Sequence, residues 1–421
     1  MKQIAPDLPV EANGPATFGL ADNGMSRPGG KIGVAVLTGG SDRPYVYGLV
    51  TELLSKSATL DLIGSDELDL PEFRDRPHLH FLNLRGDQSS EVGLWNKIAR
   101  ISKYYLRLIR YAATAEPKIF HILWNNKFET LDRTLLMLYY RFLGKCIVLT
   151  AHNVNMAKRD SQDTLLNRIT LRIQYRLAHH IFVHTEKMKD ELKDEFGVQE
   201  THVTVIPFGI NNSVPNTNLT PREARKLLGI AEGEKAILFF GRITPYKGLE
   251  YLVKAFQQLC DEGENCKLII AGRPDCSEQY WNALQETIWQ SLQQDRVLLR
   301  SEFIPNEQTE IFFKAADILV LPYREIYQSG VLFLGHSFGL PVLAADVGSL
   351  SEDIAEGETG FVFKAQDVPN LTKTLKRYFA SDLFRELKGR RENIRAHAME
   401  RHSWDVVGQK TIRKYQDLLE K

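Results

Sequence analysis

Two cations that lie five residues apart follow a buried apolar run. The run spans residues 236–240. Gly241, Arg242, Lys247 and Gly248 follow it. A guanidinium offers forked donors to phosphate oxygens, and a lysine adds a mobile point charge. Glycines let other backbone approach closely, and a helix start favours anions. The spacing predicts a grip on a nucleoside diphosphate, which would also neutralise the charge on the departing diphosphate.

A second segment could supply backbone donors to the same phosphates. It opens a predicted helix with Gln328, Ser329, Gly330 and Val331. N–H groups at such a helix start can cradle phosphate oxygens. The chain contains no Asp-x-Asp pair and no His or Cys cluster with metal-ligand spacing. We therefore expect a metal-independent site in which Arg242, Lys247 and helix N-termini hold the diphosphate.

These residues need a scaffold of alternating strands and helices. Short apolar runs predict strands at residues 32–37, 118–123, 145–150, 181–184, 203–206, 236–240, 267–271, 297–300, 318–321 and 342–344. Amphipathic stretches predict helices at residues 47–56, 249–259, 279–292 and 308–315. Such alternation indicates parallel sheets covered on both faces. The predicted fold class is α/β, with two tandem Rossmann-like doubly wound domains that face a cleft.

The domain boundaries follow the irregular segments. We expect a flexible N-terminal tail at residues 1–30, an acceptor domain at 31–210, a polar linker at 211–221, a nucleotide-sugar domain at 222–400 and a C-terminal helix at 401–421.

Composition excludes several classes of protein. Hydrophobic residues make up 43% of the 421 residues, and 53 Lys and Arg balance 53 Asp and Glu, so nothing indicates nucleic-acid binding. We expect a cytoplasmic protein because no signal peptide or membrane span is evident, and its four cysteines read as reduced thiols.

The ordered set of motifs in the second half resembles family 4 retaining glycosyltransferases of the GT-B fold. The matching segments are Gly241 to Gly248, Ala271-Gly272, Ala316 to Pro322, Gly339 to Val342 and Glu356 to Gly360. The first half resembles the family through Thr38-Gly39-Gly40 and through His152, which follows a strand. His402-Ser403-Trp404 resembles the start of the family's last helix, which returns to the N-terminal domain.

This resemblance implies roles for individual residues. His152, Arg242 and Lys247 would act in catalysis, with His152 facing the transferred sugar and donating a hydrogen bond to one of its hydroxyls. Donor contacts would come from Gly39, Gly40, Gly241, Gly272, Ile304, Glu325, Gln328, Ser329, Gly330 and Val331. We expect acceptor contacts from His121, Trp124 and Asn126. His179, His180 and His184 are interpreted as structural.

The chain departs from the family at one pair of positions. The family usually presents two glutamates eight residues apart, the second of them seven residues before the proline of Gly-x-Pro. Here the positions hold Ile326 and Leu334. Glu325 and Gln328 lie close to the first position and could contact sugar hydroxyls, but nothing replaces the second. The resemblance therefore implies a divergent member that lacks the usual carboxylate contact to the ribose.

Residues 95–176 form a basic region, with 15 Lys and Arg against 5 Asp and Glu. Apolar residues alternate with these charges on predicted helices. The pattern suits an anionic membrane surface or a lipid-diphosphate acceptor, and it equally suits a solvated helical face.

The function implied is transfer of a hexose from a UDP-, GDP- or dTDP-sugar, without a cofactor, to a hydroxyl of a glycan or lipid-linked acceptor, as in polysaccharide biosynthesis. The enzyme would work in the cytoplasm, including peripherally at the inner face of the membrane. Two alternatives stay open: a two-domain sugar-nucleotide epimerase, and a catalytically silent homologue that binds a sugar nucleotide or a partner enzyme.

Overall fold

The computed structural model describes residues 32–39, 42–88, 94–159, 162–211, 214–291 and 294–420. The first of its two sheets has the order β3-β2-β1-β4-β5-β6-β7, and the strands are paired in parallel throughout. These strands are β1 (Gly33–Leu37), β2 (Thr59–Gly64), β3 (Leu79–Asn83), β4 (Ile119–Ile122), β5 (Cys146–Thr150), β6 (His180–Val183) and β7 (Val203–Val205).

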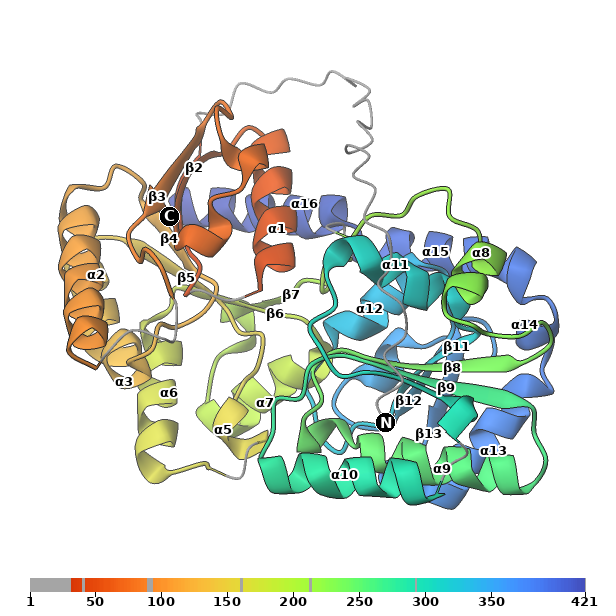
Figure 1. The fold of residues 1–421 in the computed structure, drawn as a ribbon. Coiled ribbons are helices and arrows are strands. Elements are labelled where there is room, and N and C mark those ends of the chain that lie inside the picture. Colours follow the sequence, from red (N-terminus) through yellow and green to blue (C-terminus); the bar gives the residue numbers. More distant parts are fainter. Residues whose placement is uncertain are drawn as a thin grey trace.

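Helices cover both faces of this sheet. One face packs against α1 (Arg43–Ser55) and α16 (Trp404–Leu419). The other packs against α2 (Leu94–Thr114), α4 (Met137–Phe142), α6 (Leu165–Leu177) and α7 (Glu186–Phe196). Short turns of helix link some of these elements: α3 (Glu129–Leu131) and η3 (Asp132–Leu136) precede α4, and α5 (Met156–Arg159) follows β5. Figure 1 shows α2, α3 and α6 together at one side of the molecule.

The second sheet has the order β10-β9-β8-β11-β12-β13, again with parallel pairing. Its strands are β8 (Lys235–Phe240), β9 (Cys266–Ala271), β10 (Val297–Arg300), β11 (Ile318–Leu321), β12 (Val342–Ala345) and β13 (Gly360–Phe363). One face carries α9 (Leu249–Asp261), α10 (Glu278–Ser291) and α13 (Val368–Phe379), and the other carries α8 (Pro221–Leu227), α11 (Asn306–Ala315) and α12 (Gly330–Ser337). Next to α12 packs α15 (Leu387–His402).

The predicted fold class is confirmed, because both sheets are doubly wound and the strand order reverses in each, between β1 and β4 and between β8 and β11. Three strands were not predicted from the sequence. β2 and β3 carry polar residues among their apolar ones, and the edge strand β3 is only partly buried. The segment of β13 stood out as a glycine motif rather than as a strand.

The chain crosses between the domains twice, and the two crossings lie side by side. Residues 206–211 lead into the second domain, and residues 402–404 lead back. Ile210 donates from its backbone N to the His402 carbonyl at 3.0 Å, and the Trp404 indole donates to the Ile210 carbonyl at 2.7 Å. The helix α16 then packs against α1, where Gly48 leaves room for the Trp404 ring. The expected tail at residues 1–30 lies outside the described residues.

The linker segment is fixed to the second domain. Thr217 donates to the Glu310 carboxylate from its backbone N at 2.9 Å and from its hydroxyl at 2.8 Å. Lys314 donates to the Thr217 carbonyl at 2.6 Å, so residues 214–220 follow the surface of α11.

Candidate active site

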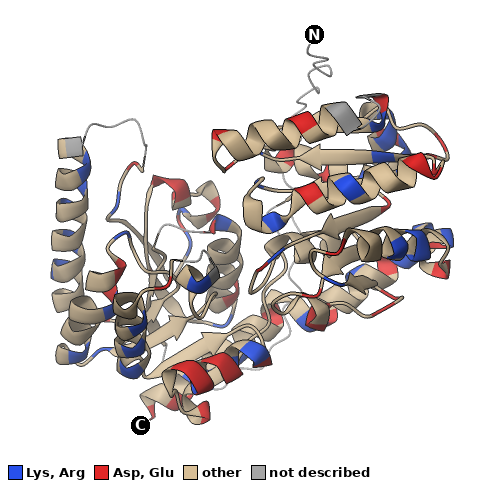
Figure 2. Cartoon of the chain, turned by 90° about the horizontal axis from the view of Figure 1, so that it is seen from below, with Lys and Arg blue, Asp and Glu red and all other residues tan. Residues whose placement is uncertain are grey.

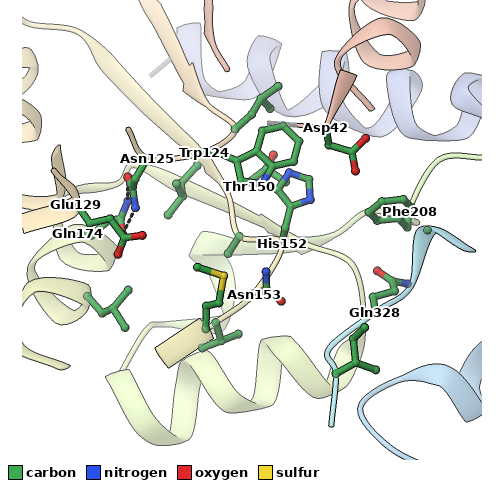
Figure 3. A pocket seen from close by; sticks show the side chains of 18 of the residues that line it. Asp42, Trp124, Asn125, Glu129, Thr150, His152, Asn153, Gln174, Phe208 and Gln328 are labelled. Atoms are coloured by element: carbon green, nitrogen blue, oxygen red, sulfur yellow. Dashed lines mark hydrogen bonds between the residues drawn. The ribbon is translucent and has the colours of Figure 1, made fainter. Parts of the chain in front are cut away.

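A cavity of about 670 Å³ lies between the two domains. The first domain contributes Trp124, His152 and Gln174 to its lining, and the second contributes Arg242 and Gln328 (Figure 3). Most of these residues follow the carboxyl ends of β4, β5 and β8, close to the points where the strand order reverses. Ligands of doubly wound sheets bind at such switch points.

Two glycines at adjacent strand ends of the second domain precede the residues that line the cavity on this side. Gly241 follows β8 with φ 101°, and Gly272 follows β9 with φ 148°. A Cβ on Gly272 would lie 2.0 Å from the Gly241 carbonyl oxygen, and the positive φ of Gly241 disfavours a side chain there as well. Beyond them, Arg242 lines the cavity and pairs with Asp275 at 3.0 Å. Its side chain is two-thirds exposed, so it can exchange this partner for a phosphate.

Lys247 is a buried cation that lies next to Gly241, behind the residues that line the cavity. Its Nζ lies 2.9 Å from the point where a Gly241 Cβ would be and 5.6 Å from the centre of the Tyr323 ring. Burial, and secondarily the charge of Arg242, lower the pKa of Lys247 from 10.5 to about 8. Within the described part of the chain, no carboxylate forms an ion pair with it. The charge is therefore available for a ligand.

The loop before α12 supplies polar groups to the same side. Gln328 lines the cavity, donates to Asp353 at 3.3 Å, and leaves its Oε1 buried without a hydrogen-bond partner. Gly330 lines the cavity at the N-terminus of α12, and Ser329 is the N-cap residue. Val331 lies 3.5 Å from the Gly241 Cβ position.

Of the predicted donor contacts, Gln328 and Gly330 line the cavity, and the others that the structure describes lie outside its lining. Two of these others have surroundings that do not suit a ligand contact. Ile304 is 8% exposed and packs in the core of the second domain. Glu325 is exposed to solvent and is not part of the cavity lining. We therefore withdraw both as donor contacts in this conformation. The two positions where the family has glutamates differ in location. Ile326 lines the cavity, and Leu334 is buried in the core.

On the N-terminal side, the imidazole of His152 stacks on the Trp124 ring with a 4.1 Å centroid distance and a 5° interplanar angle. Its Nδ1 lies 2.9 Å from His184 Nε2, and His184 Nδ1 lies 3.2 Å from the Ile206 carbonyl oxygen. A carbonyl only accepts, so His184 carries its proton on Nδ1 and accepts at Nε2. His152 then donates from Nδ1, which leaves a lone pair on Nε2.

This chain of hydrogen bonds bears on two predictions. His152 Nε2 is buried without a partner, and it can accept a hydrogen bond but not donate one. Burial, aided by neighbouring His184, lowers the pKa of His152 well below 6.5, so the ring stays neutral. In this tautomer His152 would accept a hydrogen bond from a sugar hydroxyl, whereas the sequence analysis expected it to donate one. His184, interpreted from the sequence as structural, hydrogen-bonds to His152 and thereby favours this tautomer of its ring.

Two predicted acceptor contacts do not reach the cavity. His121 is fully buried, with Nε2 2.7 Å from the Thr150 hydroxyl and Nδ1 2.5 Å from the Tyr415 hydroxyl. Burial lowers its pKa to about 3, and its bond to Tyr415 ties α16 to the sheet. Asn126 bonds to Tyr104 and Asp132 and is not part of the lining. We therefore withdraw both residues as acceptor contacts.

Other polar side chains line the first-domain side of the cavity. The Gln174 and Asn125 amides pair at 2.8 Å and line the cavity with Asp42, Glu129 and Arg133 (Figure 3). No sequence motif marked these residues. Gly39 has φ 59° and packs against the Trp124 carbonyl. A Cβ at this position would lie 2.4 Å from the carbonyl oxygen. Gly40 lies outside the described residues.

Two kinds of feature are absent from the part of the chain that the structure describes. No three His, Cys, Asp or Glu side chains among them come together as metal ligands. In the same part of the chain, no helix is long and apolar enough to cross a membrane.

Two Rossmann-like domains with a cavity between their switch points define the GT-B class of glycosyltransferase folds. Residues 44–214 match the family described as "Glycosyltransferase Family 4", and residues 221–399 match "Glycosyl transferases group 1". The chain belongs to this family of glycosyltransferases, as the sequence motifs predicted.

Individual relatives are more distant. An uncharacterized glycosyltransferase of Methanocaldococcus jannaschii is 29% identical over 241 residues, which take in 56% of this chain and 59% of the relative. The chain thus matches little more than half of that protein's length. Sucrose-phosphate synthase from Thermosynechococcus elongatus superimposes with a TM-score of 0.73 at 18% identity, covering 93% of this chain and all of that one. HepE from Anabaena, solved with UDP, gives 0.71 at 16% identity, covering 92% and 100%. These two structures establish the fold.

Proposed function

We propose that the chain is a retaining glycosyltransferase that moves a hexose from a nucleoside-diphosphate sugar to a hydroxyl of a glycan or lipid-linked acceptor. The observation that carries the proposal is Lys247, a buried ammonium without a carboxylate partner among the described residues, which lies beside Gly241 just behind the cavity-lining Arg242. A UDP-, GDP- or dTDP-sugar would supply the missing anion, without a cofactor or metal.

The reaction follows from the placement of charge. The donor diphosphate would lie along Arg242, Lys247 and the N-terminus of α12, whose positive charges stabilise the leaving diphosphate as its bond to the sugar breaks. The sugar then carries oxocarbenium-like positive charge. The acceptor hydroxyl attacks the same face of the sugar, and a phosphate oxygen of the leaving group takes its proton.

His152 would hold the sugar without repelling it. Its Nε2 lone pair can accept a hydrogen bond from a sugar hydroxyl, and the neutral ring adds no positive charge beside the developing cation. The Trp124 ring fixes the imidazole plane. Acceptor binding would fall to the first-domain side of the cavity, around Asn125 and Gln174.

A catalytically silent homologue is the second candidate. It is favoured by Ile326 and Leu334, because the structure offers no carboxylate at either position for the ribose. Such a protein would bind a nucleotide and turn over no donor.

Thermal-shift titration with UDP, GDP and dTDP tests nucleotide binding, and release of free nucleotide from the matching sugar donors tests turnover. UDP is the first choice because HepE was solved with it. Arg242→Ala should weaken nucleotide binding more than tenfold, since it removes a charge-assisted contact.

Arg385→Ala is the matched control, because Arg385 is an exposed arginine of the same domain that pairs with Asp382. Equal responses of the two variants would contradict the diphosphate grip. Binding without turnover of any donor would favour the silent homologue.

We also propose that the enzyme works in the cytoplasm, and at the inner face of a membrane when its acceptor is lipid-linked. The support is the excess of basic over acidic residues in 95–176.

A further inference from the structure

The helix α2 presents an apolar stripe to solvent. Trp95, Ile98, Leu106 and Ile109 are 82%, 47%, 60% and 40% exposed. Their spacing of three, eight and three residues places them on one side of the helix, separate from the side formed by Tyr104 and Leu108 that packs in the core. Large apolar side chains this exposed cost free energy in water unless something covers them.

The stripe continues onto the neighbouring helices. Leu135, Leu138 and Phe142 follow at helical spacing along η3 and α4, with Phe142 87% exposed. The Tyr139 hydroxyl donates to the Ile109 carbonyl at 3.2 Å, which joins α4 to α2.

A third helix completes the surface. Leu165, Leu166 and Ile169 on α6 are 76%, 61% and 44% exposed. Arg133 on η3 donates to Asn167 on α6 at 2.8 Å, so these helices are neighbours too. We name the exposed side of α2, η3, α4 and α6 the apolar-basic face.

The two longest helices of this face, α2 and α6, carry basic residues and no acidic ones. The sequence of α2 contains Lys97, Arg100, Lys103, Arg107 and Arg110, and that of α6 contains Arg168, Arg172 and Arg176; neither contains Asp or Glu. Figure 2 shows the blue segments of α2 along the outer edge of the first domain. Basic residues interleaved with exposed Trp, Phe and Leu match the interface of an anionic bilayer, where apolar side chains enter the acyl boundary and cations meet phosphates.

We propose that the apolar-basic face docks on an anionic phospholipid bilayer; the link to a lipid-linked acceptor rests on the proposed function. The face and the cavity share the turns α3 and η3, since Glu129 and Arg133 line the cavity while Leu135 of the same η3 turn is exposed on the face. An acceptor headgroup at the bilayer surface would enter from this side. A second copy of the chain is a poorer occupant, because a twofold interface would place these basic helices against each other.

The test is flotation of the whole protein with vesicles of phosphatidylglycerol and phosphatidylcholine, compared with phosphatidylcholine alone. We expect binding to the anionic vesicles only, weakened by salt because the cations contribute. The double variant Trp95→Ser/Phe142→Ser should lower the partition coefficient at least tenfold. Arg107→Ala/Arg110→Ala should lower it on anionic vesicles roughly tenfold.

Trp289→Ser is the matched control, because Trp289 is 41% exposed on α10 of the other domain. It should float like the parent protein. Thermal-shift titration with UDP should be unchanged in all of these variants, which separates docking from the nucleotide site.

Two results would overturn the docking proposal. One is absence of parent binding to anionic vesicles. The other is a change of oligomeric state, measured by analytical ultracentrifugation, in Trp95→Ser/Phe142→Ser with vesicle binding intact, which would assign the face to a contact between copies. In either case nucleotide binding and turnover would still test the proposed function separately.

Discussion

Replacing Lys247 by methionine should make the empty protein more stable and the site less able to bind. A Lys247 pKa of about 8 instead of 10.5 corresponds to roughly 3 kcal/mol of unfavourable burial of the charge. Because this pKa is lower in the folded than in the unfolded state, the penalty is fully present below pH 8 and disappears as the pH rises toward 10.5. Lys247→Met keeps the side-chain length and removes the charge.

At pH 7 we therefore expect a gain of up to roughly 3 kcal/mol in the free energy of unfolding, seen as a rise of several degrees in the melting temperature. Loss of one charge-assisted hydrogen bond to the diphosphate is worth about 1.5–3 kcal/mol, so nucleotide affinity should fall by roughly 10- to 150-fold. Melting curves with and without UDP measure both effects.

Lys314→Met is the matched control, since Lys314 is buried in the same domain but pairs with Glu310 at 2.8 Å. Breaking that pair should destabilise the protein by roughly 3–5 kcal/mol and leave the UDP affinity unchanged. If Lys247→Met instead lowered the melting temperature and preserved the response to UDP, the lysine would be a structural residue and the reasoning would fail.

Three further predictions concern the site. Nucleotide affinity of the parent should decline as the pH rises above about 8, where Lys247 loses its proton, and Lys247→Met should lack this step; an identical profile in both proteins would point to another group. His152→Ala should lower kcat while nucleotide affinity stays nearly constant, and His184→Ala should lower kcat less, with ¹⁵N spectra showing a mixture of His152 tautomers; kcat within about threefold of the parent in His152→Ala would indicate a structural role. Turnover should persist in excess EDTA, and a loss that added metal restores would reveal ligands beyond those we recognise.

Much of the architecture was predictable because buried parallel strands are continuous apolar runs. The strand that ends at Gly241 and the strand before His152 were found in this way, and with them the residues that follow strand ends. β2 and β3 were not predicted because Asp61 and His80 interrupt their apolar pattern.

Side-chain direction was not predictable. His121 lies in β4 and Trp124 follows it three residues later, yet His121 contacts Tyr415 of α16 and Trp124 lines the cavity. The role of His184 depends on a hydrogen bond to the Ile206 carbonyl, a tertiary contact that no local pattern indicates.

The return of α16 to the first domain affects how the protein can be synthesised. Trp404, Val407, Ile412 and Tyr415 complete a core whose other buried members come from the first half of the chain, and Trp404 lies 194 positions after Ile210. At a translation rate of roughly 5–20 residues per second, the face beneath α16 would wait roughly 10–40 s for its cover after Ile210 is made. During that time the nascent first domain exposes apolar surface, which makes it a natural client for chaperones bound at the ribosome.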